Sequence, residues 1–218
     1  MRSVFWWIYA GCYDVAWDSP ITRELAQRVA VELPEVTSVA DVGCGTGLSA
    51  ALLTARGVRV RGVDACGAMV RRAIRAGRIS TGAVRDAAET NLPAGSVDAA
   101  LCANLLHLHA QPMAVLDELT RIVAPGGKIV LVTPMPGLQH GMILKADRGS
   151  GRGYLRSVIA DITRQAIAVI GSFSAITVRG ADEVDAQVRD AAHRSGWLLR
   201  RQGEVGGLQR YSVYEVVE

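Results

Sequence analysis

The feature that most constrains the fold of this chain is a regular alternation of short apolar runs with segments of helical periodicity. The apolar runs have the length of strands and occupy residues 36–43, 58–64, 80–86, 97–104 and 128–133. The helical segments between them occupy about residues 47–56, 68–76 and a stretch that begins at Pro112. Strands that alternate with helices at this spacing form a parallel sheet covered on both faces. We therefore predict an α/β fold with a doubly wound sheet.

The two ends of the chain depart from this alternation. Ser19 and Pro20 suit the N-cap and first turn of a helix, which Pro34 ends. A further helix is predicted at about 182–194, followed by two strand-like runs that are separated by glycines. Such a pair of runs predicts a short antiparallel hairpin. The sheet is thus expected to be mostly parallel, with an antiparallel C-terminal hairpin.

The length of 218 residues favours a single domain. Residues 137–180 interrupt the alternation with a glycine-rich stretch and an amphipathic helix at about 154–170, which predicts a helical cap insertion. We expect four parts: an N-terminal lid segment and helix, a cofactor-binding core, a substrate cap, and a C-terminal helix and hairpin. Their expected bounds are 1–35, 36–136, 137–180 and 181–218.

Composition narrows the choice of partners and location. The net charge of +3 comes from scattered residues, so nucleic acid is not an expected partner. Without a run of eighteen apolar residues we expect no membrane span, and without a CxxC pair we expect reduced thiols and no metal. Residues 1–12 resemble a short export signal, although an aromatic segment that packs over a ligand is the alternative that we favour. We expect a cytoplasmic protein that binds a small-molecule acceptor, with a homodimer left open.

A glycine-rich turn follows the first strand. Gly43, Gly45 and Gly47 carry no Cβ atom and can adopt positive φ, which lets a ligand lie against the backbone. The spacing is one residue tighter than in a dinucleotide-binding turn, and Asp41 at its mouth would repel a pyrophosphate but attract an ammonium group. Asp64 ends the second strand, where a carboxylate can accept hydrogen bonds from both hydroxyls of a ribose.

A third acid, Asp86, ends the third strand and could accept a hydrogen bond from the exocyclic amine of adenine. The ligand therefore needs a ribose, an adenine and a cationic amino acid end, and it needs no phosphate. S-adenosylmethionine fits that description. In isolation, Asp64 would be read as a helix cap and Gly45 as part of a plain tight turn.

Four segments, taken in order, resemble one family. The segments VADVGCGTG, VRGVDACGAMV, VRDAAETNLPAGSVDAALCANLLHLH and LDELTRIVAPGGKIVLV are similar to the class I S-adenosylmethionine-dependent methyltransferases of the small-molecule type, over about residues 36–134. The resemblance implies a Rossmann-like fold and S-adenosyl-L-methionine as the cofactor. It assigns cofactor binding to Asp41, Gly43, Cys44, Gly45, Gly47, Asp64, Ala65, Met69, Asp86, Ala87, Asn104 and Leu105.

Within this set the resemblance implies a division of roles. The glycine turn would line the methionine part, Asp64 would hold the ribose, and Ala65 and Met69 would flank the adenine. Asn104 and Leu105 would face the sulfonium. The chain departs from the family at Asp86, which lies seven residues before Pro93 instead of about five.

Fewer residues of the sequence indicate how the reaction is catalysed and where the methyl acceptor binds. His107 and His109 follow the fourth strand beside the expected methyl group, and histidine is the side chain best suited to accept a proton near neutral pH. The candidates for contact with the acceptor are Tyr9, Tyr13, Asp14 and His140. The apolar side chains that suggest a partly hydrophobic acceptor are Phe5, Trp6, Trp7, Trp17, Met142 and Ile143.

Two exclusions narrow the reaction. The segment 104–107 lacks the Asn/Asp-Pro-Pro-aromatic turn of enzymes that methylate bases, and residues 101–111 hold no carboxylate for a metal. We expect transfer of a methyl group to an O, N or C atom of a small, partly hydrophobic metabolite by in-line displacement. The alternatives are a reaction such as cyclisation that uses the same cofactor, a non-catalytic cofactor-binding partner and, with least support, a nicotinamide oxidoreductase.

Overall fold

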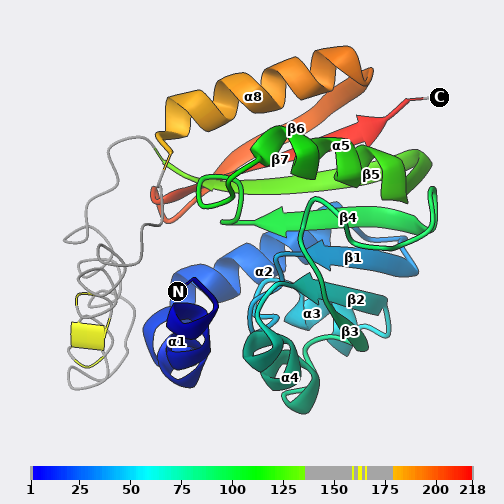
Figure 1. The fold of residues 1–218 in the computed structure, drawn as a ribbon. Coiled ribbons are helices and arrows are strands. Elements are labelled where there is room, and N and C mark those ends of the chain that lie inside the picture. Colours follow the sequence, from blue (N-terminus) through cyan, green and yellow to red (C-terminus); the bar gives the residue numbers. More distant parts are fainter. Residues whose placement is uncertain (1, 136–158, 160–161, 164, 166–178, 218) are drawn as a thin grey trace.

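A computed structural model describes residues 2–135, 159, 162–163, 165 and 179–217 of the chain (Figure 1). Most of the predicted cap lies outside the described residues. The seven strands form one sheet with the order β3-β2-β1-β4-β5-β7-β6. Their bounds are Ser38–Val42 (β1), Arg59–Asp64 (β2), Thr81–Val84 (β3), Val97–Ala103 (β4), Val123–Pro134 (β5), Trp197–Val205 (β6) and Gln209–Val216 (β7).

The directions of the strands match the prediction. Strands β1 to β5 pair in parallel, whereas β7 is antiparallel to both β5 and β6. The strand order reverses beside β1, so ligands are expected at the carboxyl ends of β1 and its neighbours. The doubly wound, mostly parallel sheet with an antiparallel C-terminal hairpin is confirmed.

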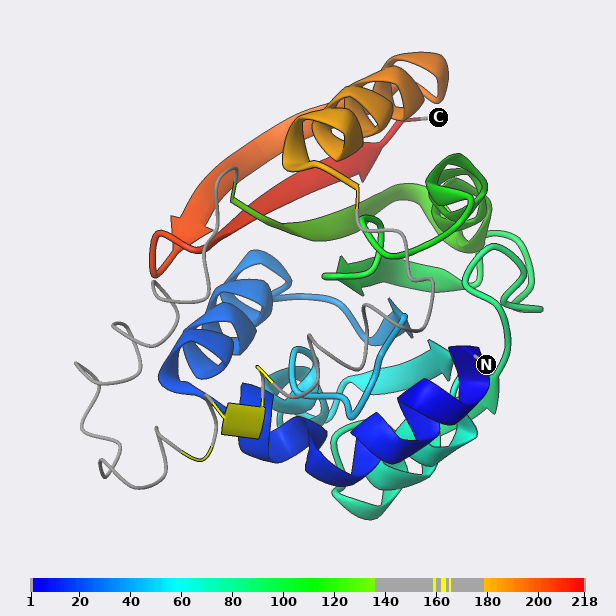
Figure 2. The same ribbon diagram turned by 60° about the vertical axis from the view of Figure 1, so that its left-hand side comes forward.

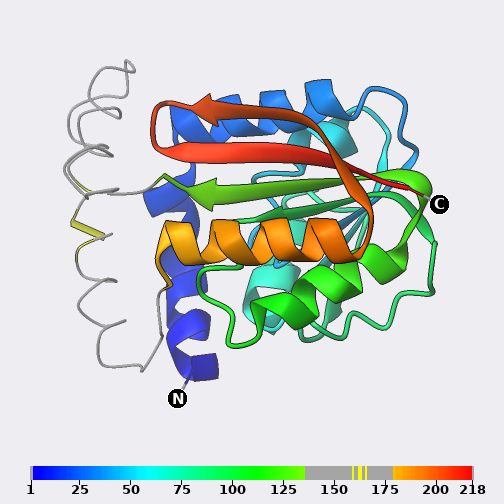
Figure 3. The same ribbon diagram turned by 90° about the horizontal axis from the view of Figure 1, so that it is seen from above.

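Helices cover both faces of the sheet (Figure 3). They are α1 (Arg2–Trp17), α2 (Pro20–Glu32), α3 (Ala51–Ala55), α4 (Gly67–Arg75), α5 (Pro112–Ile122) and α8 (Ala181–Arg194). Successive residues of a strand point to opposite faces, so Val39 packs in the core with α2, α3 and α4, and Ala40 in the core with α5 and α8. Because both faces are covered, all five residues of β1 are buried.

Several predicted helices have the expected bounds. Ser19 is the N-cap of α2, and its hydroxyl accepts a hydrogen bond from the backbone N–H of Thr22 at 3.3 Å. The helix expected at 47–56 was too long, because α3 begins only at Ala51 and no side chain caps an earlier start. Helical spacing places Ile74 on the same face as Met69, Val70 and Ala73, and at the end of α4 it remains 44% exposed.

Helix α1 lies across the carboxyl ends of the parallel strands and beside α4 (Figures 2 and 3). Its Tyr9 and Ala10 pack in a small cluster with Cys66 and Met69. The arrangement places an aromatic helix at the carboxyl ends of the strands, beside the glycine turn. In the part of the chain that the structure describes, no helix is long and apolar enough to cross a membrane.

Candidate cofactor and acceptor site

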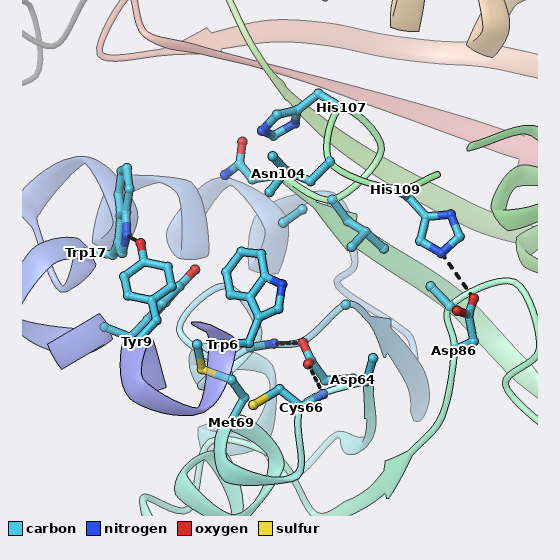
Figure 4. Close-up of a pocket in the computed structure, with 18 of the residues that line it drawn as sticks. Trp6, Tyr9, Trp17, Asp64, Cys66, Met69, Asp86, Asn104, His107 and His109 are labelled. Atoms are coloured by element: carbon cyan, nitrogen blue, oxygen red, sulfur yellow. Dashed lines mark hydrogen bonds and ion pairs between the residues drawn. The ribbon is translucent and has the colours of Figure 1, made fainter. Parts of the chain in front are cut away.

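A cavity of about 570 Å³ opens at the carboxyl ends of β1 to β5 and is bounded by α1 (Figure 4). The predicted residues that line it are Tyr9, Tyr13, Gly43, Gly45, Asp64, Ala65, Met69, Asp86, Ala87, Asn104, Leu105, His107 and His109. A smaller cavity of about 40 Å³ adjoins it and is lined by Asp41 and Cys44. The structure thus brings most of the predicted residues to one place.

The glycine turn forms the floor of the large cavity. Gly43 has φ of +74°, and a Cβ atom built there would lie 2.7 Å from Cδ2 of Leu105. A side chain at this position is therefore excluded both by backbone conformation and by space. The N–H groups of Gly43 and Cys44 donate to the carbonyl of Val63 at 2.7 and 3.0 Å, which ties the turn to β2.

Gly47 has a different role from the other two glycines. It lines neither cavity, and a Cβ atom there would lie 2.9 Å from Cβ of Arg78 and 3.3 Å from Cβ of Ala73. The glycine therefore permits close packing of the turn against the end of α4. No contact in the structure supports the predicted approach of a ligand to this residue.

Asp64 connects the glycine turn to the start of α4. Its Oδ2 accepts from the N–H of Gly45 at 2.9 Å, and its Oδ1 accepts from the N–H of Cys66 at 2.8 Å. Burial raises the pKa of the carboxyl, and these two hydrogen bonds act in the opposite direction. Both oxygens retain lone pairs for a further donor, and the side chain lies at the cavity wall (Figure 4).

Asp41 is the most deeply buried acid of the site. The residue is 1% exposed, and its Oδ2 has no hydrogen-bond partner among the described residues. Burial, followed by the nearby charge of Asp64, raises the pKa of Asp41 to about 7. A buried carboxylate without a partner is costly, so the small cavity favours a cationic or hydrogen-donating group.

Four aromatic residues of α1 line the large cavity. Trp6, Tyr9, Tyr13 and Trp17 are spaced three or four residues apart, and successive ring centroids lie 5.4, 5.1 and 6.4 Å apart. The indole N–H of Trp17 donates to the hydroxyl of Tyr9 (Figure 4). These rings form an aromatic wall of the cavity, whereas Trp7 is 63% exposed and does not line it.

Asp14 anchors α1 to the body of the domain and does not line the cavity. Its carboxylate accepts from the hydroxyl of Thr46 at 2.7 Å and pairs with Arg72 at 3.0 Å and Arg78 at 3.1 Å. These hydrogen bonds lower the pKa of Asp14, although burial acts against them. Because its oxygens are engaged by the turn and by the end of α4, this arrangement gives no support to the predicted contact of Asp14 with the methyl acceptor.

The two candidate histidines occupy different environments. Burial lowers the pKa of His107 to about 4, and its Nδ1 has no partner among the described residues. In His109, Nδ1 accepts from the N–H of Gln111 at 3.1 Å, so Nε2 carries the proton and donates to Asp86 at 3.1 Å. His107 is therefore neutral and available, whereas both ring nitrogens of His109 are engaged.

Some residues of the site gave no signal in the sequence. Arg179 donates from its backbone N–H to the carbonyl of His107 at 2.9 Å, and its guanidinium donates to the carbonyls of His109 and Ala110. It thereby fixes the turn that carries both histidines. The residues that line the large cavity and were not predicted are Cys66, Ala103, Leu108, Ala110, Gln111, Pro134 and Gln209.

Part of the prediction falls elsewhere. His140, Met142 and Ile143 lie outside the described residues, and for Phe5 only the helical backbone is described. Asp86 lies at the cavity despite its unusual spacing from Pro93, and its Oδ1 accepts from the N–H of Ala88 at 2.9 Å. In the described part of the chain, no group of three or more His, Cys, Asp and Glu residues could hold a metal ion.

The donor set of the site fits S-adenosylmethionine. The cavity floor is bare backbone at Gly43 and Gly45, the buried Oδ2 of Asp41 lacks a partner, and Asp64 offers lone pairs at the wall. No Lys or Arg side chain among the described residues lines either cavity, so a diphosphate would find no positive partner there. The residues thus suit a cationic nucleoside better than a dinucleotide.

Comparisons with known proteins agree with this assignment. The methyltransferase domain family matches residues 40–131. An uncharacterized methyltransferase of Mycobacterium tuberculosis, Rv0089, is 35% identical over 134 residues, which are 59% of this chain and 66% of that protein. The chain thus spans slightly less than two thirds of the length of the curated relatives that it matches.

Solved structures share the fold at low sequence identity. A SAM-dependent methyltransferase from Aquifex aeolicus has a TM-score of 0.62 and 20% identity over 92% of this chain and 95% of that one. The 1,6-didemethyltoxoflavin-N1-methyltransferase of Burkholderia thailandensis has a TM-score of 0.67 and 17% identity over 100% of this chain and 87% of that one. Residues 40–131 thus belong to the methyltransferase domain family, and the donor set together with these comparisons supports a class I S-adenosylmethionine-dependent methyltransferase with S-adenosylmethionine as its cofactor.

Proposed function

We propose that this protein transfers a methyl group to an O, N or C atom of a small, partly hydrophobic acceptor, and that the preferred atom carries a proton. The observation that carries the proposal is the position of His107. Its neutral imidazole, with an unpartnered Nδ1, lines the same cavity as the glycine turn and Asp64. In the tautomer that carries its proton on Nε2, the Nδ1 of His107 can accept the proton that the methyl acceptor must release, and a pKa of about 4 makes it a weak base that favours an acidic O–H or N–H group.

The residues at the carboxyl ends of the strands would hold and orient the cofactor and the methyl acceptor. Bound S-adenosylmethionine supplies an activated methyl group on a sulfonium. Asp64 would accept hydrogen bonds from the ribose, and Asp41 would compensate the charge of the amino acid end. Ala65 and Met69, together with Cys66, would contact the adenine. Alignment within one enclosed cavity is the main contribution that such a reaction needs from the protein.

The acceptor would lie on the side of the aromatic wall and the turn at 104–111. Trp6, Tyr9 and Tyr13 offer large flat surfaces with few freely rotating bonds, which suit a planar or partly hydrophobic molecule. We infer that α1 forms the lid that the sequence predicts. It would exclude water from the methyl group, and the predicted cap at 137–180 lies almost entirely outside the described residues.

Calorimetry with S-adenosylhomocysteine tests the cofactor half of the proposal. Asp64→Ala should weaken its affinity at least tenfold, because the ribose loses a charge-assisted acceptor worth roughly 1.5–3 kcal/mol. Asp64→Asn retains the shape and should lose less. Asp117→Ala, at an exposed ion pair on α5, is the matched control and should bind like the wild type.

Product analysis tests the reaction itself. Release of S-adenosylhomocysteine, together with a methylated acceptor, supports methyl transfer. Methylthioadenosine as the product would instead favour cyclisation of the cofactor's own chain, and tight binding without any turnover would favour a non-catalytic partner. An unchanged affinity of Asp64→Ala would remove the ribose assignment.

A further inference from the structure

Gln209 is a half-buried residue that neither the sequence motifs nor the proposed mechanism uses. It is the first residue of β7 and pairs with Pro134 of β5 and Val205 of β6. Its side-chain Oε1 is buried and has no hydrogen-bond partner in the described part of the chain. An amide carbonyl that is withdrawn from water without a partner costs free energy, so its retention calls for an explanation.

The position of Gln209 supplies that explanation. The residue lines both the large and the small cavity. Of the six buried side-chain polar atoms without a partner among the described residues, three belong to residues that line these cavities. They are Oδ2 of Asp41, Nδ1 of His107 and Oε1 of Gln209. Oε1 of Gln209 and Oδ2 of ionised Asp41 are hydrogen-bond acceptors, and Nδ1 of neutral His107 is one in the tautomer that carries its proton on Nε2, so ligands that pair with these atoms must bring donors.

The position of Gln209 in the sheet favours contact with the methyl acceptor. The three acids that fit the cofactor, Asp41, Asp64 and Asp86, lie at or just after the carboxyl ends of β1, β2 and β3, on one half of the sheet. Gln209 comes from β7, on the other half, next to the end of β5 and on the same side of β1 as the turn that carries His107. In the proposed function, the carboxylate of Asp41 already pairs with the cationic end of the cofactor, and the imidazole of His107 already takes the proton of the reacting group.

We propose that Gln209 is a specificity-determining residue whose amide oxygen accepts a hydrogen bond from a second N–H or O–H group of the acceptor. The acceptor class is thus a planar aromatic molecule with two donors, one at the reacting atom for His107 and one for Gln209, held against the aromatic rings of α1. This inference rests on the proposed function. A site built to bind a donor rejects an analogue that lacks it, because the buried acceptor is then left unpaired.

The test uses the protein saturated with S-adenosylhomocysteine and three matched probes. The probes are 2,7-dihydroxynaphthalene, 7-methoxy-2-naphthol and 2,7-dimethoxynaphthalene, and calorimetry measures their affinities. The wild type should bind the dihydroxy probe about tenfold more tightly than the monomethoxy probe. In Gln209→Met, which keeps the length of the side chain but removes the amide, this preference should disappear while the affinity for S-adenosylhomocysteine stays the same.

Two further variants keep the result interpretable. Gln187→Met is the matched control, because Oε1 of Gln187 is also buried and unpartnered but lines no cavity. It should retain the full preference. Gln209→Glu retains an acceptor oxygen at the same place, so it should keep the preference as well, and it provides a second reading where Gln209→Met fails to fold.

The outcomes separate this inference from the proposed function. Equal affinity for the three probes in the wild type, or no binding of any, overturns the role of Gln209. So does a Gln209→Met variant that binds S-adenosylhomocysteine tenfold more weakly but keeps its preference among the probes, because the amide would then serve the cofactor. If the wild type does not bind S-adenosylhomocysteine at all, the proposed function fails first.

Discussion

Asp41 is the residue whose ionisation has the widest consequences. In the free protein burial raises its pKa to about 7, so the carboxyl is largely protonated at pH 6 and ionised at pH 8. If the ionised form binds the cationic end of the cofactor, affinity for S-adenosylhomocysteine should be roughly tenfold weaker at pH 6 than at pH 8. Calorimetry at both values tests this, and Asp41→Asn should show no such dependence.

The same residue should affect stability in the opposite sense. A raised folded-state pKa means that stability falls as pH rises from about 4 to about 7, because the unfolded chain ionises first. At pH 8 the buried charge is fully present, so Asp41→Asn should raise the free energy of unfolding by about 2 kcal/mol. Near pH 4 the two proteins should differ little. A variant that is less stable than the wild type at pH 8 would contradict this account.

His107 should remain neutral over the whole physiological range. Burial lowers its pKa to about 4, so the imidazole should take up a proton only in acid solution. Nitrogen-detected NMR titration checks this, with His107→Gln used to assign the signals and the exposed His193 as the internal reference. A His107 signal that titrates between pH 6 and 7 would show that the ring is solvated.

At the scale of elements, Asp14 is a charged anchor of α1, in addition to the apolar packing of Tyr9 and Ala10. Asp14 joins the helix to Thr46, Arg72 and Arg78, and the carboxylate is only 18% exposed. Asp14→Ala should destabilise the protein by about 1–3 kcal/mol, because three partners lose a charged acceptor. Hydrogen exchange in α1 should become faster, and S-adenosylhomocysteine should dissociate sooner. Asp18→Ala removes an exposed ion pair with Arg23 and serves as the control.

At the scale of the molecule, ligand binding should stabilise the fold as a unit. S-adenosylhomocysteine at about 100 times its Kd should add roughly 2.7 kcal/mol, which corresponds to a rise in Tm of about 5–10 °C for a chain of this size. Thermal unfolding with and without the ligand measures the rise. NAD should give no rise, because no basic side chain among the described residues lines either cavity. A larger rise with NAD would reverse the choice of cofactor.

An element could be predicted when the residues that specify it are adjacent in the chain. Strand β1 was predictable because its apolar residues and the turn at Gly43 and Gly45 are contiguous in the chain. Helix α3 was not, because its start depends on how the turn packs through Gly47 against the end of α4. The exposure of Ile74 was not predictable either, since helical spacing cannot show where a neighbouring strand ends and solvent begins.

For the site, the sequence by itself determined which feature follows each parallel strand. The glycine turn follows β1, Asp64 ends β2, Asp86 follows β3, and the turn with His107 follows β4. These features are local, because a backbone conformation or a side chain at a strand end is specified by a few adjacent residues. Only the tertiary structure decided that His109 is engaged by Asp86, that Asp14 is an anchor, and that Gln209 reaches the same cavity. Those contacts join residues far apart in the chain, so they depend on how whole elements meet.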